Sequence, residues 1–348
     1  MIIIYILIGI VSILLIMFVK DVLQKENTIK RNFPLFGRLR YVFLALGPPI
    51  RQYLIASNRE ELPFNRSQRN WIDKSSKKVN NYEGFGTDKD LYNPGHIFVN
   101  PKMFPYSPKK DHINNDKNDP YFLPCAKIIG ESHKRKHPYR PYSIVNISAM
   151  SYGSLSKTAQ SALNLGAEMV GCYHNTGEGG LSPYHQKGAD AVFHIGTGYF
   201  GCGKTGENGE RYFDWETFEN LVLKQYPGKV KAIEVKLSQG AKPGKGGVLP
   251  SKKNTKEIAA IRGVEPHTDV LSPSSHSAFS NVREMVDFIE MLAEKSGLPV
   301  GIKSAVGDLS HWNELADIMK NENKGPDFIT IDGGEGGTGA APPSFADH

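Results

Sequence analysis

The chain has 348 residues, of which 39% are hydrophobic and 22% charged, a balance that fits a globular protein and excludes a disordered or fibrous chain. The net charge of +6 is uneven, because residues 20–140 hold 23 Lys+Arg against 12 Asp+Glu. No nucleic-acid-binding signature accompanies this basic segment, so an anionic membrane surface is favoured over nucleic acid as its partner.

Residues 2–19 form an apolar run that no charged residue interrupts and that is long enough to cross a bilayer as a helix. Basic residues such as Lys20 and Lys25 all follow the run, which lacks the basic start and the cleavage site of a signal peptide. We therefore expect a single-pass membrane protein whose catalytic domain lies in the cytoplasm. The alternative is a buried helix of a soluble core, which usually carries polar positions.

A second apolar stretch, residues 41–46, is too short to span a membrane and is expected to lie on its surface or to pack against the body of the protein. Residues 57–141 are polar, and prolines in Phe104-Pro105-Tyr106 and in residues 119–124 indicate extended backbone. We read this part as a wrap around the main domain. The predicted organisation is an anchor at residues 1–20, a basic juxtamembrane and wrapping segment at 21–140, and a catalytic domain at 141–348.

From residue 142 onward, short apolar runs alternate with segments of helical periodicity. Strands are predicted at residues 143–148, 172–175, 191–195, 232–237, 270–271, 299–302 and 328–331. Helices are predicted at residues 157–170, 214–225, 255–262, 281–295 and 312–319. Ser156 and Asn281 are the predicted N-caps of two of these helices. Strands that alternate with helices indicate an α/β fold with a parallel sheet and right-handed crossovers.

Glycine-rich and polar motifs follow the ends of the predicted strands, where both barrels and doubly wound sheets place their active sites. The fingerprint G-x-G-x-x-G of a doubly wound dinucleotide-binding fold is absent between the first strand and the first helix, which favours a TIM (β/α)8-type barrel. Six or seven strands can be counted, depending on whether residues 191–195 form a strand, whereas a closed barrel of this type needs eight. We therefore expect a barrel that is incomplete at the C-terminus, either as a fragment or as a chain that a partner completes.

Four motifs carry a family resemblance: residues 147–154 (ISAMSYGS), 175–180 (NTGEGG), 234–247 (EVKLSQGAKPGKGG) and 332–340 (DGGEGGTGA). In this order they resemble the FMN-binding domain of glutamate synthase, over roughly residues 140–348. The N-terminal part is similar to stand-alone membrane members of the family. The resemblance implies a glutamate synthase-type oxidoreductase of glutamate biosynthesis, in which reduced FMN reduces 2-iminoglutarate, formed from 2-oxoglutarate and ammonia, to L-glutamate.

The resemblance also implies a flavin site. The backbone of Ala149, Met150 and Ser151 would follow one edge of the isoalloxazine ring, beside glycines that allow close approach. Lys303 would stabilise the anionic reduced ring near its N1 and O2 atoms. Outside this family context, a lysine at a strand end is more often exposed or paired. The other cofactor-binding residues that the resemblance implies are Asn175, Lys236, Gly333 and Gly334.

The implied substrate group consists of Glu178, Gln239, Lys242 and Arg262. A dicarboxylate such as 2-oxoglutarate needs cations, and a guanidinium binds a carboxylate with two hydrogen bonds. Glu178 and Lys242 are the implied catalytic residues, and Glu178 would move a proton or hold ammonia beside the imine. Without the resemblance, Glu178 would be read as a loop carboxylate that caps backbone amides.

The sequence departs from the family pattern at Lys245, where the family commonly has Glu, and at His276, where the large enzymes carry a proline- and histidine-rich turn. Cysteines 125, 172 and 202 lie far apart, so they support neither an iron–sulfur cluster nor zinc, and we expect buried bystanders. We find no N-terminal catalytic cysteine in the sequence, so we do not expect this chain to hydrolyse glutamine itself. The electron donor and the ammonia source stay open. The alternatives are an FMN enzyme for another 2-oxo acid or imine, and an inactive membrane-tethered scaffold.

Overall fold

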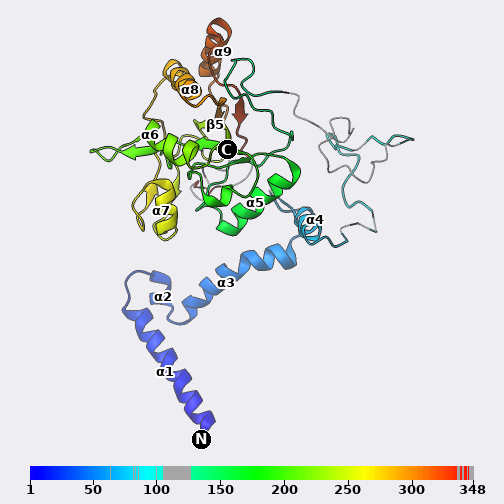
Figure 1. The fold of residues 1–348 in the computed structure, drawn as a ribbon. Helices are drawn as coiled ribbons and strands as arrows, with labels where there is room; N and C mark the ends of the chain where they lie inside the picture. The colour runs from blue at the N-terminus through cyan, green and yellow to red at the C-terminus, as the bar shows by residue number, and fades with distance from the viewer. Residues whose placement is uncertain are drawn as a thin grey trace. The chain divides into compact units, whose positions relative to one another are not determined.

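The computed structural model describes the chain apart from residues 63, 81, 83, 85, 99, 105–126, 335–337, 339–340, 343 and 345–348. The chain divides into two compact units, residues 1–100 and 101–348 (Figure 1). The predicted extended segment at residues 119–124, Cys125 and most of the Phe104-Pro105-Tyr106 stretch lie outside the described residues. The predicted domain boundary at residue 140 stays a prediction.

The first unit is helical. Its elements are α1 (Ile2–Leu23), α2 (Thr28–Asn32), α3 (Phe36–Ile50), the π-helical turn η1 (Arg51–Ile55) and α4 (Arg66–Ser76) (Figure 1). α1 is long and apolar enough to cross a membrane, and its apolar window is not buried within the structure. A signal sequence passes the same test of length and composition, so α1 is a candidate span. At its end, buried Asp21 accepts two hydrogen bonds from the guanidinium of Arg38 on α3, which ties the two helices together.

Two features of this unit differ from expectation. α3 extends beyond the apolar stretch and contains Pro48 and Pro49, and a π-helical turn follows it directly. The prediction of a wholly extended wrap is wrong for α4. Asn65 and Gln68 form a capping box that starts this helix, a signal that the polar composition of the segment concealed.

The second unit is built on a parallel sheet. Its five strands lie in the spatial order β1 (His174–Asn175), β2 (Ala191–Ile195), β5 (Val230–Lys236), β8 (Val300–Ser304) and β9 (Ile329–Ile331). A parallel bridge from Ile147 to His174 extends the sheet beside β1. The spatial order follows the sequence order, as in a (β/α) barrel, whereas the order reverses in a doubly wound sheet. The predicted α/β fold with a parallel sheet is confirmed.

Helices connect these strands. They are α5 (Lys157–Val170), the 3-10 turn η2 (Pro183–His185), α6 (Trp215–Phe218) with its π-helical continuation η3 (Glu219–Lys224), α7 (Lys256–Arg262), α8 (Val282–Ser296) and α9 (Ser310–Glu322) (Figure 1). Both predicted N-caps are confirmed. The Ser156 hydroxyl accepts a hydrogen bond from the Ala159 amide at 3.2 Å, and the Asn281 side chain accepts one from the Glu284 amide at 2.9 Å.

The two faces of the sheet differ in polarity. Ile233 and Val235 of β5 pack with α8 and α9 in the main hydrophobic core, together with Phe193, Ile195, Val300, Ile302, Val286, Ile289, Leu292 and Leu315. The alternate positions Glu234 and Lys236 are buried as well, yet they are charged. Successive side chains of a strand point to opposite faces, so the charged residues lie on the face away from this core.

The sheet is strongly curled. Asn175 on β1 and Thr330 at β9 both donate hydrogen bonds to the carboxylate of Glu234 on β5, at 2.9 and 2.7 Å. In a flat sheet, four spacings of about 4.8 Å would put β1 and β9 about 19 Å apart. The described strands therefore form a half-barrel whose charged concave face closes around Glu234.

Three features of the strands differ from the prediction, although a strand is present at residues 270–271 as predicted. The strand expected at residues 143–148 is reduced to the bridge at Ile147. The Asn146 side chain donates to the Ser143 carbonyl, which turns the chain locally, and accepts a hydrogen bond from the Tyr173 amide. β7 (Val270–Leu271) pairs antiparallel with β6 (Val248–Leu249) outside the parallel sheet. A hairpin of β3 (Gly203–Thr205) and β4 (Arg211–Phe213) was not predicted.

Candidate active site

Two loops meet at the C-terminal edge of the half-barrel. A Cβ added at Gly177, which has a φ of +64°, would lie 2.5 Å from the Ser151 amide nitrogen and 2.7 Å from the Met150 carbonyl carbon. A Cβ added at Gly179 would also be too close to Ser151, at 2.9 Å from its Cβ. Glycine at both positions is therefore required by the close approach of the 175–180 loop to the 149–151 segment. The structure thus brings Ala149, Met150, Ser151 and Asn175 together, and their cofactor role stays a prediction.

Glu178 lies at the centre of the edge. One carboxylate oxygen is 3.2 Å from the ammonium of Lys236, and the other is 4.0 Å from that of Lys242. Gly196 and Gly247 leave the space that this side chain occupies. Burial alone would raise the pKa of Glu178, but the two lysines and His194 outweigh it and lower this pKa to about 2. Glu178 is therefore an anion throughout the neutral range.

Lys242 and Lys236 differ in how closely protein groups contact their ammonium groups. Lys236 also donates a hydrogen bond to the side-chain oxygen of Gln239 at 3.0 Å. Lys242 is 2% exposed, and burial lowers its pKa, an effect that Glu178 partly opposes. A buried ammonium is costly unless an anion stands close to it. The 4.0 Å spacing to Glu178 leaves Lys242 able to bind a second anion.

Arg262, at the end of α7, is a second buried cation with few partners. It is 4% exposed, and one guanidinium nitrogen donates to the Tyr152 carbonyl at 3.1 Å. Its Nε is buried and makes no hydrogen bond within the described residues. The guanidinium also stacks over the Phe200 ring at 5.3 Å, and burial lowers its pKa. The orphan Nε–H favours an additional acceptor, such as a ligand carboxylate.

Lys303, at the end of β8, is buried and lies beside Lys236 in the strand register. Its ammonium is 2.8 Å from a carboxylate oxygen of Asp332, and the other oxygen of Asp332 accepts a hydrogen bond from the Gly240 amide at 2.7 Å. A Cβ on Gly240 would lie 2.1 Å from the carbonyl oxygen of Gly333, so these loops also touch. Gly333 and its neighbour Gly334 are exposed at this edge.

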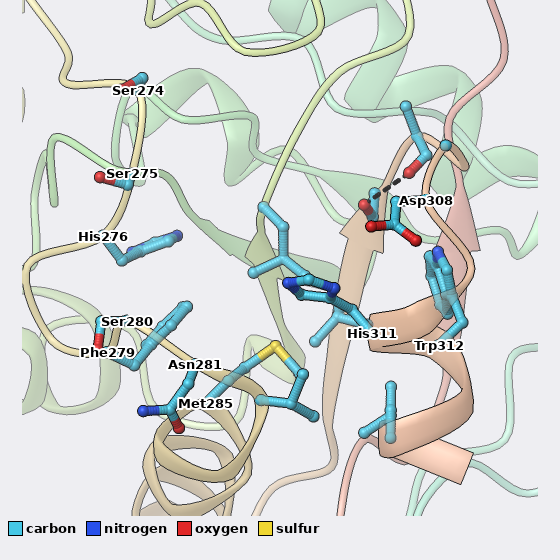
Figure 2. Close-up of a pocket in the computed structure, with 17 residues that line it drawn as sticks. Ser274, Ser275, His276, Phe279, Ser280, Asn281, Met285, Asp308, His311 and Trp312 are labelled. Carbon is cyan, nitrogen blue, oxygen red and sulfur yellow. Dashed lines mark hydrogen bonds between the residues drawn. The ribbon is translucent and has the colours of Figure 1, made fainter.

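Three cavities open along this edge. A polar cavity of about 20 Å³ lies among Glu178, Lys236, Gln239 and Lys242, and one of about 30 Å³ lies between Ser151, Glu178 and Arg262. A larger cavity of about 400 Å³ shares Leu237 and Ser274 with the first. In Figure 2, His276 and Phe279 lie on one side of this larger cavity, and His311 and Trp312 lie on the other.

Four polar residues of the half-barrel escaped the sequence analysis: His194, Glu234, Thr330 and Asp332. The imidazole of His194 lies 2.7 Å from the same Glu234 oxygen that Asn175 contacts. A signal was present, because both faces of a covered parallel sheet are normally apolar, and β5 carries Glu234 and Lys236 at alternate positions. Of the departures noted above, His276 is fully hydrogen-bonded, to the Tyr199 hydroxyl and the Lys236 carbonyl, and Lys245 is exposed.

The residues at this edge fit an anionic, planar cofactor such as FMN. Buried Lys236 and Lys303 supply positive charge and hydrogen-bond donors. The glycines of the 175–180 loop bring backbone close to the predicted ring edge. Among the described residues, no group of three or more metal-binding side chains is present, and Cys172 and Cys202 are buried and free.

Comparison with known proteins decides the family. A sequence profile of the conserved region in glutamate synthase matches residues 85–348. The chain belongs to the glutamate synthase family. It is 41% identical to a glutamate synthase large subunit-like protein of Bacillus subtilis, over 98% of this chain and 69% of that protein. This membership marks it as an oxidoreductase of the glutamate synthase type.

Other relatives of the glutamate synthase family are matched over a smaller share of their length. An archaeal-type glutamate synthase [NADPH] of Thermotoga maritima is 35% identical over 59% of this chain and 36% of its own length. The glutamate synthase [NADPH] large chain of Bacillus subtilis is 30% identical over 58% of this chain and 12% of its own length. The chain thus spans about a third or less of these two relatives.

Proposed function

We propose that this chain carries the FMN-dependent step of glutamate synthesis, the reduction of 2-iminoglutarate to L-glutamate. The observation that carries the proposal is the ionised Glu178 between Lys236 and Lys242, within 4.0 Å of both, with buried Arg262 beside it. These groups lie at the strand ends next to the 149–151 segment, to which the resemblance assigns the edge of the flavin ring. The family membership supports the same chemistry.

The charge balance at this edge favours an anionic substrate. Four cations, Lys236, Lys242, Arg262 and Lys303, stand against three carboxylates, Glu178, Glu234 and Asp332, which leaves one positive charge before His194 is considered. Two of the cations, Lys242 and Arg262, have incomplete partners in the protein. A 2-oxoglutarate carboxylate would complete the hydrogen bonds of each, and Arg262 is suited to a two-point contact.

Each residue then has a defined task. Lys242 and Arg262 bind the substrate carboxylates, and Gln239, held by Lys236, orients the 2-oxo group. Bound FMN, when reduced, supplies the hydride for the imine carbon. A carboxylate whose pKa is about 2 is a poor proton donor and a weak base at neutral pH, so Glu178 is better suited to hold ammonia near the 2-oxo carbon, by accepting a hydrogen bond from it, than to transfer protons.

The direct test uses the full chain in detergent with excess FMN. The flavin is reduced photochemically without oxygen, and 2-oxoglutarate and ammonium are then added, so that no protein electron donor is needed. Faster flavin reoxidation with both additions than with either alone is the expected result. A panel of pyruvate, oxaloacetate and 2-oxobutyrate tests the alternative of another 2-oxo acid. No reoxidation with any acid would favour the inactive scaffold.

We further propose that α1 anchors the protein in the membrane as a single span, with the catalytic unit in the cytoplasm. The supporting observations are the apolar window of α1, which the structure leaves unburied, and the excess of basic residues in the segment that follows. The three parts predicted from the sequence, divided at residues 20 and 140, remain part of this proposal. Protease protection of each end in sealed vesicles tests the orientation.

A further inference from the structure

The Glu234 carboxylate receives hydrogen bonds from three strands other than its own. Asn175 of β1 and His194 of β2 bond one oxygen, at 2.9 and 2.7 Å, and the Thr330 hydroxyl of β9 bonds the other at 2.7 Å. Glu234 is 3% exposed. A carboxylate this deeply buried persists only when its oxygens are satisfied, so the three donors and the carboxylate form one interdependent unit.

This unit continues into the catalytic edge through Asn175. The amide group of Asn175 donates to Glu234, and its oxygen accepts a hydrogen bond from the Gly177 amide at 3.1 Å. Because Glu234 accepts only, it fixes which end of the Asn175 side chain faces the loop. Gly177 packs directly on Ser151, and Glu178 follows it in the chain. The position of Glu178 thus depends on Glu234, which lies in the interior of the half-barrel.

We propose that Glu234 is a positioning residue of the active site. Its carboxylate orients the Asn175 amide, which holds the Gly177 turn and thereby places Glu178 between Lys236 and Lys242. A simple tie between strands would also use these hydrogen bonds, but it would not require Asn175 to keep one orientation. The catalytic consequence rests on the proposed function, whereas the structural consequence can be measured without substrate or flavin.

Exchanging the donor and the acceptor in the Asn175–Glu234 hydrogen bond distinguishes a positioning role of Glu234 from a simple tie between strands. Asn175→Asp places two carboxylates face to face and breaks the link, although the new carboxylate can still accept from the Gly177 amide. In the double variant, which combines Asn175→Asp with Glu234→Gln, the introduced Gln amide can donate to the carboxylate introduced at position 175 and to the His194 nitrogen, while its oxygen accepts from Thr330. The double variant therefore restores the link with reversed polarity.

The readout is amide hydrogen exchange of residues 176–180 in the full chain, with residues 282–296 of α8 as the internal reference. Asn175→Asp should speed exchange in 176–180 about tenfold, with α8 unchanged, and the double variant should return it to within about threefold of the parent chain. Unchanged exchange in the single variant, or no recovery in the double variant, would overturn the proposal.

Two further variants keep the proposal testable if the Asn175→Asp variant does not fold. Thr330→Val removes a hydrogen bond from the same carboxylate on the side away from Asn175, so it should leave residues 176–180 protected. In Glu234→Gln alone the side-chain amide can also donate toward Asn175, so the orientation of Asn175 is no longer fixed and exchange in 176–180 should speed up. Loss of protection in 176–180 in the Thr330 variant, or unchanged exchange in the Glu234 variant, would contradict the proposal. Failure of the flavin assay in the parent chain would count against the proposed function alone.

Discussion

A substitution at Lys242 should distinguish an effect on substrate binding from an effect on stability most clearly. At 4.0 Å from Glu178, its Coulomb attraction is about 4 kcal/mol at an effective dielectric constant of about 20, and the cost of burying the ammonium offsets this by several kcal/mol. Lys242→Met keeps the length of the side chain and removes the charge. We expect the free energy of unfolding to change by less than about 1 kcal/mol, because the two contributions nearly cancel and Glu178 keeps Lys236 as a partner at 3.2 Å.

Binding should respond differently. If Lys242 contacts a substrate carboxylate, its loss removes a charge-assisted hydrogen bond of about 1.5–3 kcal/mol, which weakens 2-oxoglutarate binding roughly 10- to 150-fold. The rise in melting temperature with 2-oxoglutarate concentration reports this affinity without an electron donor. Lys245→Met is the matched control, because Lys245 lies on the same loop and is exposed. Equal binding by the Lys242 variant and the parent chain would refute the assignment.

Three other outcomes are expected. The pKa of Glu178 is lowered from 4.5 to about 2, so the stability that its ionised form contributes is complete above pH 4.5 and is lost as the pH falls toward 2. In Glu178→Gln, the free energy of unfolding, measured in urea, should therefore fall less steeply between pH 4.5 and pH 2 than in the parent chain. Gly177→Ala should lower the free energy of unfolding by about 1–3 kcal/mol, measured in urea, because its Cβ would lie 2.5 Å from the Ser151 amide. Deletion of residues 2–23 should release the protein from membranes in high salt, measured by sedimentation.

A specific result would contradict each of these three predictions. An unchanged acid limb in the Glu178 variant would show that its carboxylate is not stabilised in the folded protein. Full stability of the Gly177 variant would mean that the two loops separate readily. Retention of the deleted chain on membranes at high salt would show that α1 is not the principal anchor.

Local signals in the sequence predicted local structure well. α5 was predicted at its observed bounds, and α8 to within one residue, because the capping side chains of Ser156 and Asn281 act within a single turn. The loops that carry Glu178 and Lys242 were located at the ends of predicted strands, whereas the roles expected of these two residues and of Lys303 on β8 came from the family resemblance.

Contacts between distant residues were harder to predict. The alternation in β5 shows that Glu234 and Lys236 share a face, but no local pattern shows that Asn175 and Thr330 reach the same carboxylate from opposite edges of the sheet. The pairing of β7 with β6 likewise depends on how the 238–247 loop returns, since a run of two apolar residues does not specify a partner.

The most direct test of the proposed reaction follows nitrogen into product in a single turnover. The full chain with photochemically reduced FMN receives 2-oxoglutarate and ¹⁵N-ammonium without oxygen, and the products are separated by chirality and analysed by mass spectrometry. The account predicts ¹⁵N-labelled L-glutamate in an amount that matches the reduced flavin, and loss of this product in Lys242→Met at limiting substrate. Reoxidation of the flavin without labelled glutamate, or labelled glutamate of mixed chirality, would contradict it.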